Sequence, residues 1–84
     1  MALRVIFSGE ARADIRAIDR DTALRLLKSL ARFLETEIGD VNQLQGFDPP
    51  QYRFRIGTWR VIFRRIGAET VEIVRIRNRR EAYR

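Results

Sequence analysis

Cysteine and histidine are both absent from the 84 residues of this chain. Without cysteine there is no disulfide framework and no thiol nucleophile, and without either residue there is no zinc finger. The lack of histidine also removes the side chain most often used for general acid–base catalysis. We therefore predict no metal site and no cofactor, and any chemistry must use other groups.

Long hydrophobic runs are missing as well. The first residues lack the apolar stretch of a signal peptide, and no segment has the length of a membrane span. We therefore expect a cytoplasmic protein. The length allows a single domain, residues 1–84, with a small core, and 45% hydrophobic with 33% charged residues is typical of a globular chain.

The net charge of +6 is unevenly distributed. Residues 1–51 hold 7 Lys+Arg and 8 Asp+Glu, whereas residues 52–84 hold 10 Arg and 3 Glu, for net charges of −1 and +7. The guanidinium fork matches phosphate oxygens bidentately and keeps its charge at any working pH. Because apolar residues alternate with these arginines, we predict a folded basic surface that binds a polyanion.

The N-terminal half has the pattern of a strand followed by two helices. Residues 3–8 are β-branched and aromatic, which predicts a strand. Ser8 is a candidate N-cap for a helix over residues 9–18, and Asp19 and Asp21 are candidate caps for a second helix over residues 21–37.

The second predicted helix has a broad apolar side, and Gly39 is its candidate C-cap. Its predicted inner stripe comprises Leu24, Leu27, Leu30, Leu34 and Ile38, widened by Leu26, Ala31 and Phe33. Residues 39–51 contain both prolines and two glycines, which predicts the one connecting loop.

Beyond this loop the hydrophobic period changes from 3.6 to 2, which predicts strands. We expect strands over residues 52–56, 59–66 and 70–77, joined by a two-residue Gly-Thr turn at 57–58 and a turn at 67–68. Apolar pairs on opposite faces of residues 71–76 predict a central position for the last strand. The predicted fold class is α+β, in the order β-α-α-β-β-β, with a helical hairpin packed on one face of a small, mostly antiparallel sheet.

Strand alternation assigns each side chain to one face of this sheet. The inward set is Tyr52, Phe54, Ile56, Trp59, Val61 and Phe63. Arg53, Arg55, Arg60 and Arg64 then share the outer face. A solvated face is the ordinary alternative, but residues 50–68 contain five arginines and no acid, whereas solubility alone favours mixed signs.

A polyanionic partner can be DNA or RNA. No predicted helix is rich in base-reading residues, so a DNA-reading module is less well supported than an RNA platform with arginines on phosphates. Tyr52 and Trp59 fall on the predicted core face. Tyr83 lies in a charged tail, where it is available to stack on a base or to fold back onto the sheet.

Two segments of the chain resemble the RelE/ParE superfamily of type II toxin–antitoxin toxins. They are residues 52–63, YRFRIGTWRVIF, and residues 74–84, VRIRNRREAYR. The first has the family's alternating basic strand followed by Gly-x-aromatic-Arg-Val, and the second its closing basic cluster, acid and tyrosine. The order of elements and the length also match over the whole chain.

The resemblance implies a role for several residues. Arg53 and Arg55 match the basic positions of RelE-like enzymes, Arg60 matches the arginine on the scissile phosphate, and Tyr83 matches the C-terminal tyrosine. Arg79 is the first choice for the tail arginine and Arg80 the second. We therefore predict catalytic roles for the five residues Arg53, Arg55, Arg60, Arg79 and Tyr83, and RNA binding by Arg53, Arg55, Arg64, Arg77 and Arg80.

The resemblance further implies ribosome-dependent cleavage of mRNA, a cognate antitoxin, and the ribosome and mRNA as partners. Arginine stands at positions 53 and 55, where some RelE-like enzymes have lysine, and it cannot act as a base at working pH. Asn78 stands where many relatives have histidine, so Tyr83 is the candidate base of this cluster. The alternatives are a ParE-like, non-catalytic inhibitor of DNA gyrase and a plain RNA-binding module.

Overall fold

The computed structural model describes residues 4–78 and confirms the predicted α+β fold. The elements are β1 (Arg4–Phe7), α1 (Gly9–Ala17), α2 (Arg20–Thr36), β2 (Asp40–Leu44), β3 (Gln51–Ile56), β4 (Trp59–Ile66) and β5 (Thr70–Asn78). The order is the predicted one with one strand added, β2.

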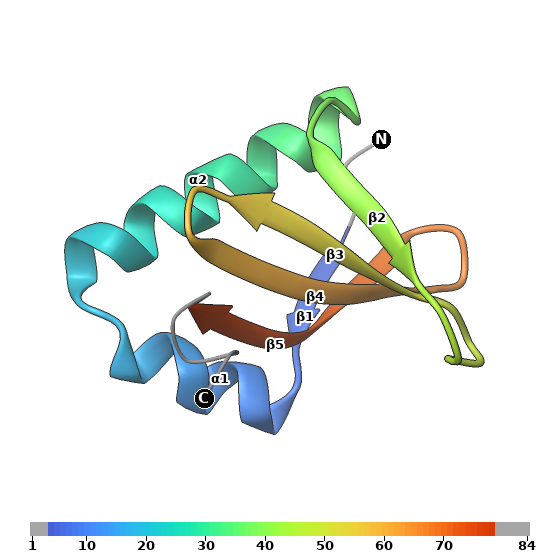
Figure 1. Cartoon of the computed structure of the whole chain (residues 1–84), viewed down its shortest axis with the longest axis horizontal. Helices are drawn as coiled ribbons and strands as arrows, with labels where there is room; N and C mark the ends of the chain where they lie inside the picture. The colour runs from blue at the N-terminus through green and yellow to red at the C-terminus, as the bar shows by residue number, and fades with distance from the viewer. Residues whose placement is uncertain (1–3, 79–84) are drawn as a thin grey trace.

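The five strands form one sheet in the order β1-β5-β4-β3-β2. Only β1 and β5 are parallel, and every other neighbouring pair is antiparallel. The predicted central position of the last strand is confirmed, because β5 lies between β1 and β4. In Figure 1, α2 runs along the β2–β3 side of the sheet and α1 runs beside β5.

The core lies between α2 and one face of the sheet. The rings of Phe33 and Phe54 stack with their centroids 4.7 Å apart, and those of Tyr52 and Phe63 stack at 5.4 Å. The largest fully buried side chains are Ile73, Val61 and Val71. The inward alternation predicted for β3 and β4 is confirmed by the burial of Phe54, Val61 and Phe63.

The predicted apolar side of α2 is confirmed in part, and Leu34 of its inner stripe packs against the core. Leu26, Leu30 and Phe33 are buried, whereas Leu24 and Leu27 are 45% and 37% exposed. Ala31 is exposed on the same side of the helix, and Ile38, beyond its end, is 80% exposed. Both stripes have helical spacing, so periodicity cannot decide which one faces the sheet.

Two of the three candidate N-caps, Ser8 and Asp19, are confirmed, whereas Asp21 lies within the first turn of α2. The hydroxyl of Ser8 accepts a hydrogen bond from the Ala11 amide at 3.0 Å, and the carboxylate of Asp19 accepts one from the Thr22 amide at 3.0 Å. The predicted C-cap was wrong. Glu37, with φ of 58°, is the left-handed cap of α2.

Gly39 serves a different purpose. A Cβ atom at this position would lie 2.8 Å from Cε1 of Phe54 and 3.0 Å from Cδ1 of Phe33. Only glycine therefore lets the chain pass this close to the stacked rings as it leaves α2 and enters β2.

The prediction of one continuous loop over residues 39–51 was wrong, because β2 occupies its first half. Val41 packs against the core while Asp40 and Asn42, on either side of it, are exposed. β2 pairs only with β3 and lies at the edge of the sheet. A five-residue edge strand with so few apolar residues leaves little hydrophobic pattern to detect.

A β-bulge in β5 changes which side chains share a face. Ile62 on β4 lies opposite Arg75, but the next residue, Phe63, lies opposite Ile73, which leaves Val74 as the extra residue. Ile76 is consequently buried with Ile73, although the sequence predicted these two residues on opposite faces. Arg75 and Arg77 are directed to the face opposite the core, as bulges commonly re-aim side chains.

Candidate functional site

Three arginines form a row across the face of the sheet opposite the core. Arg55 on β3 is directly opposite Arg60 on β4, and Arg60 is directly opposite Arg77 on β5. Directly opposite residues of antiparallel strands have Cα atoms only about 4.5–5.5 Å apart. Like charges at such positions repel each other, and a bound anion would reduce this repulsion.

A second row lies beside the first. Arg53 is opposite Ile62, which is opposite Arg75. The Nε atom of Arg53 is buried, and it has no hydrogen-bond partner within residues 4–78. A buried donor without an acceptor is uncommon in folded proteins, and a bound anion would satisfy it.

The acids near these rows neutralise only some of the arginines. Nε of Arg64 lies 2.6 Å from Oε1 of Glu72, its direct neighbour across β4 and β5. In the described part of the chain, Arg53, Arg55 and Arg77 form no ion pair. The positive charge of Arg55 and Arg77, which no described acid pairs with, therefore lies toward the β3–β4 turn. Arg64 is predicted to contact RNA, and such a contact would compete with its ion pair to Glu72.

The N-terminal cap and the acidic residues of α1 bind Arg75 and the free backbone edge of β5. β1 pairs with β5 only as far as Ile73, so among residues 4–78 the backbone beyond Ile73 has no strand on that side. The hydroxyl of Ser8 donates to the Val74 carbonyl at 2.8 Å, and the carboxylate of Asp14 accepts from the Ile76 amide at 2.8 Å. The N-cap Ser8 and Asp14 of α1 thus bond to the backbone of β5 where β1 no longer does.

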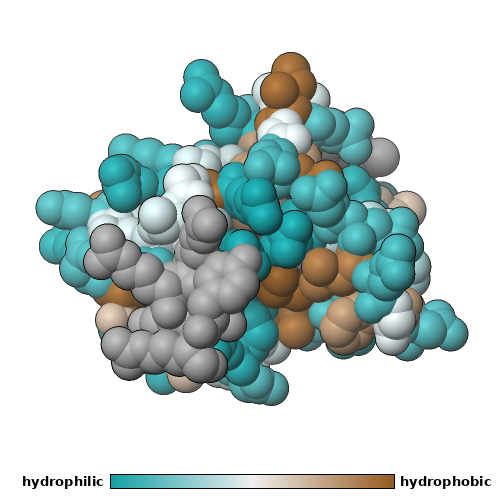
Figure 2. Space-filling model, in the orientation of Figure 1, coloured by the Kyte–Doolittle hydropathy of each residue, from teal (hydrophilic) through white to brown (hydrophobic). Residues whose placement is uncertain are grey.

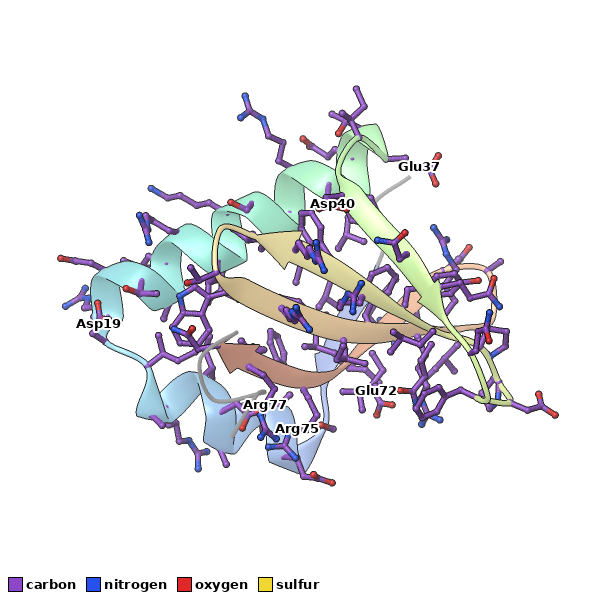
Figure 3. The ribbon with its side chains drawn as sticks, in the orientation of Figure 1. Asp19, Glu37, Asp40, Glu72, Arg75 and Arg77 are labelled. Atoms are coloured by element: carbon purple, nitrogen blue, oxygen red, sulfur yellow. The ribbon has the colours of Figure 1, made fainter. Side chains whose placement is uncertain are left out.

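Asp14 and Glu10 also pair with the guanidinium of Arg75. Its Nε lies 2.9 Å from Asp14 and its Nη1 lies 2.8 Å from Glu10. Burial raises the pKa of Asp14, but hydrogen bonds from Arg75 and from the Ile76 amide outweigh this and hold the pKa below its usual value. Figure 3 shows Arg75 and Arg77 close together on the α1 side of the sheet.

Asp14→Asn should destabilise the fold in a pH-dependent way. The variant loses charge-assisted hydrogen bonds, which contribute about 1.5–3 kcal/mol. Because the pKa of Asp14 is lowered in the folded state, its stabilisation is complete above the unfolded pKa of about 3.9 and is lost as the pH falls through the folded value. Urea unfolding at pH 7 and pH 3 measures this difference. Asp21→Asn, an exposed change of the same kind, is the control, and an equal loss in both variants at pH 7 would contradict the prediction.

The structure brings together some of the residues predicted from the sequence. Arg53, Arg55 and Arg60 lie on one face, as expected, and the bulge adds Arg77 to them. Tyr52 and Trp59 pack against the core, in agreement with their predicted position. The remaining predicted site residues, Arg79, Arg80 and Tyr83, lie outside the described residues.

One charged residue at this face has no signal in the sequence. Asp40 is directly opposite Arg55 and so continues the row of Arg55, Arg60 and Arg77 onto β2. The sequence predicts a loop at residue 40, so the alternation of strand residues does not place Asp40 on a sheet face. Figure 3 shows Asp40 at the start of β2, toward the opposite edge of the sheet from Arg75 and Arg77.

Figure 2 shows the surface in the same orientation, with hydrophilic residues spread over the middle of the molecule and a hydrophobic area beside them. Within residues 4–78, no three His, Cys, Asp or Glu side chains are arranged to hold a metal ion. Neither of the two described helices is both long enough and apolar enough to cross a membrane.

The family to which this chain belongs can be stated from its sequence match. Residues 5–83 match the model of a family described as the ParE toxin of the type II toxin–antitoxin system parDE. The chain belongs to this toxin family. No curated protein matches the chain significantly.

Solved toxins of RelE type share the fold of this family member. It is similar to a chain of the archaeal RelE–RelB complex from Pyrococcus horikoshii, with 21% identity and a TM-score of 0.73 over 94% of this chain and 97% of that one. It is also similar to a chain of the RelBE2 toxin–antitoxin complex from Mycobacterium tuberculosis, with 23% identity and a TM-score of 0.74. This match covers 94% of this chain and 100% of that one. A third similar structure is a mutant of the E. coli toxin RelE in the free state, with 24% identity and a TM-score of 0.74. This match covers 98% of this chain and 87% of that one.

Proposed function

We propose that this toxin is a ribosome-dependent mRNA endoribonuclease that inhibits translation. The observation that carries the proposal is the row of Arg55, Arg60 and Arg77 on the sheet face opposite the core. Fixed guanidinium groups of this kind bind phosphate and stabilise the charge that develops on it during cleavage. The buried Nε of Arg53 beside the row has no hydrogen-bond partner among residues 4–78, which supports an anionic ligand.

The proposed reaction is attack by a ribose 2′-hydroxyl on the adjacent phosphate. Arg60, in the middle of the row, would bind the scissile phosphate, and Arg55 and Arg77 would contact it or its neighbours. Guanidinium groups supply charge stabilisation but cannot accept a proton. The sequence assigns proton acceptance to Tyr83 and further phosphate contact to Arg79 or Arg80, and these roles remain predictions.

The ribosome and mRNA are proposed partners, together with a cognate antitoxin, and the proposed location is the cytoplasm. Two of the similar structures are toxin–antitoxin complexes, which supports an antitoxin partner here. The sheet face has few groups that can accept or donate a proton, so we expect it to depend on the ribosome to orient the RNA. Orientation of the reacting groups can supply a large part of a rate enhancement.

The second candidate is a non-catalytic inhibitor of DNA gyrase, because the matching family is described by its ParE toxin. Two assays on the same purified protein separate the candidates. We expect mRNA cut at codons on translating ribosomes, negligible cutting of free RNA, and undisturbed supercoiling by gyrase. Inhibited supercoiling with intact mRNA would support the second candidate and contradict the proposal.

A further inference from the structure

A carboxylate on β2 has no assigned role although it adjoins the arginine row. Asp40 is directly opposite Arg55, and the core packing of Val41 directs Asp40 to the other face. Arg55 is in turn directly opposite Arg60. Neighbouring strands lie about 4.8 Å apart, so Asp40 stands only about 10 Å from Arg60 along the row.

Asp40 differs from the other carboxylates close to this face. Glu72 is bound to Arg64 at 2.6 Å, and both Asp14 and Glu10 are bound to Arg75. The side chain of Asp40 forms no ion pair or hydrogen bond with any residue in the range 4–78. It is exposed at the edge of the sheet and available to a ligand.

We infer that Asp40 is a catalytic residue and accepts the proton of the attacking 2′-hydroxyl. This inference rests on the proposed RNA cleavage. A phosphate held between Arg55 and Arg60 has its neighbouring ribose on one side of the row, and Asp40 is the carboxylate on the β2 side. A general base acts directly or through one water molecule, which suits a short side chain next to long arginines.

The cleavage step forms one bond to phosphorus and breaks another. Asp40 takes the proton of the 2′-hydroxyl while O2′ bonds to phosphorus, and the bond between phosphorus and the 5′ oxygen breaks. The leaving oxygen takes a proton from water, and Asp40 returns its proton to the solvent. The products are a 2′,3′-cyclic phosphate and a 5′-hydroxyl, and Arg55 and Arg60 stabilise the added negative charge on the phosphate oxygens.

The test compares Asp40→Asn with wild type on mRNA bound to ribosomes, under single-turnover conditions at saturating toxin. General-base catalysis contributes about 10²–10⁴ in rate, so we expect the cleavage rate to fall at least about 100-fold with unchanged ribosome binding. Asp48→Asn, the same change in an exposed loop, should cleave as wild type does. Asp40→Glu restores the carboxylate and should recover part of the rate.

Because Asp40→Asn also removes a negative charge, the same experiment has an outcome that would contradict the inference. If Asp40 only neutralises Arg55, its removal leaves a more positive face that binds RNA more tightly and cleaves at an undiminished rate. That result in Asp40→Asn, while wild type cleaves, would overturn the inference and leave the proposed function intact. No cleavage by wild type would overturn both.

Tyr83→Phe in the same assay separates the two candidate bases. If Asp40 is the base, the phenylalanine variant keeps much more activity than Asp40→Asn, because a ring at position 83 can still stack on a base. The reverse order of activities would contradict the assignment to Asp40 and support Tyr83. Thermal unfolding of each variant confirms that the compared proteins are folded.

Discussion

Arg60→Ala is expected to lower the rate of ribosome-dependent mRNA cleavage by about 10²–10³-fold, the usual cost of removing one donor that stabilises transition-state charge. Arg60 lies between Arg55 and Arg77, so in this row it is the guanidinium with another arginine directly opposite it on both sides. The loss should appear in the rate at saturation more than in ribosome binding, because the other arginines of the face continue to attract RNA. In vitro translation with primer extension at the cleavage sites measures it.

Arg65→Ala is the matched control for this experiment. It removes the same charge from the same strand, but Arg65 lies near the other face, where it lines a hollow of about 260 Å³ with Phe33, Tyr52 and Phe63. Its ion pair with Glu37 is long, at 3.4 Å, and exposed, and such surface pairs contribute little stability. Equal cleavage by the two variants would show that the row is not the reactive site.

Phe63→Ala is expected to destabilise the fold by about 3–5 kcal/mol, the range for removing a buried aromatic side chain. Phe63 is 3% exposed and packs between the rings of Phe33, with centroids 5.9 Å apart, and Tyr52, at 5.4 Å. Domains of this size have a free energy of unfolding of only roughly 4–13 kcal/mol. The variant should therefore lose a large part of its stability.

Thermal and urea unfolding measure this loss. A decrease of about 3 kcal/mol corresponds to a Tm lower by at least about 12 °C in a domain of this length. Ile66→Ala, at a position 43% exposed on the same strand, should change the stability far less. A similar decrease in both variants would mean that the aromatic cluster is not the centre of the core.

Much of the fold and of the arginine face followed from local patterns in the sequence. The alternation of apolar and basic residues in β3 and β4 is short-range, and a Gly-Thr turn with Gly57 at φ of 60° sets their register. These two facts alone place Arg53, Arg55 and Arg60 on one face. The absence of histidine and cysteine likewise limits the chemistry that this face can perform, because imidazole and thiol groups are excluded.

Long-range packing decided the rest. β2 exists because its backbone pairs with β3, and this pairing is what brings Asp40 to the arginine row. The stripe of α2 that is buried depends on how the helix crosses the sheet, since both candidate stripes have the same period.

The bulge at Val74 shows most clearly what local patterns cannot determine. Simple alternation places Arg75 and Arg77 with Val71 and Ile73 on the core face, but the extra residue in β5 reverses this from Arg75 onward. A bulge arises from the fit between two strands and has no fixed local signature in either one. The sequence by itself thus determined the composition of the basic face and four of its arginines. The pairing of β2, β4 and β5 in the tertiary structure decided how far this face extends and placed Asp40 at its edge.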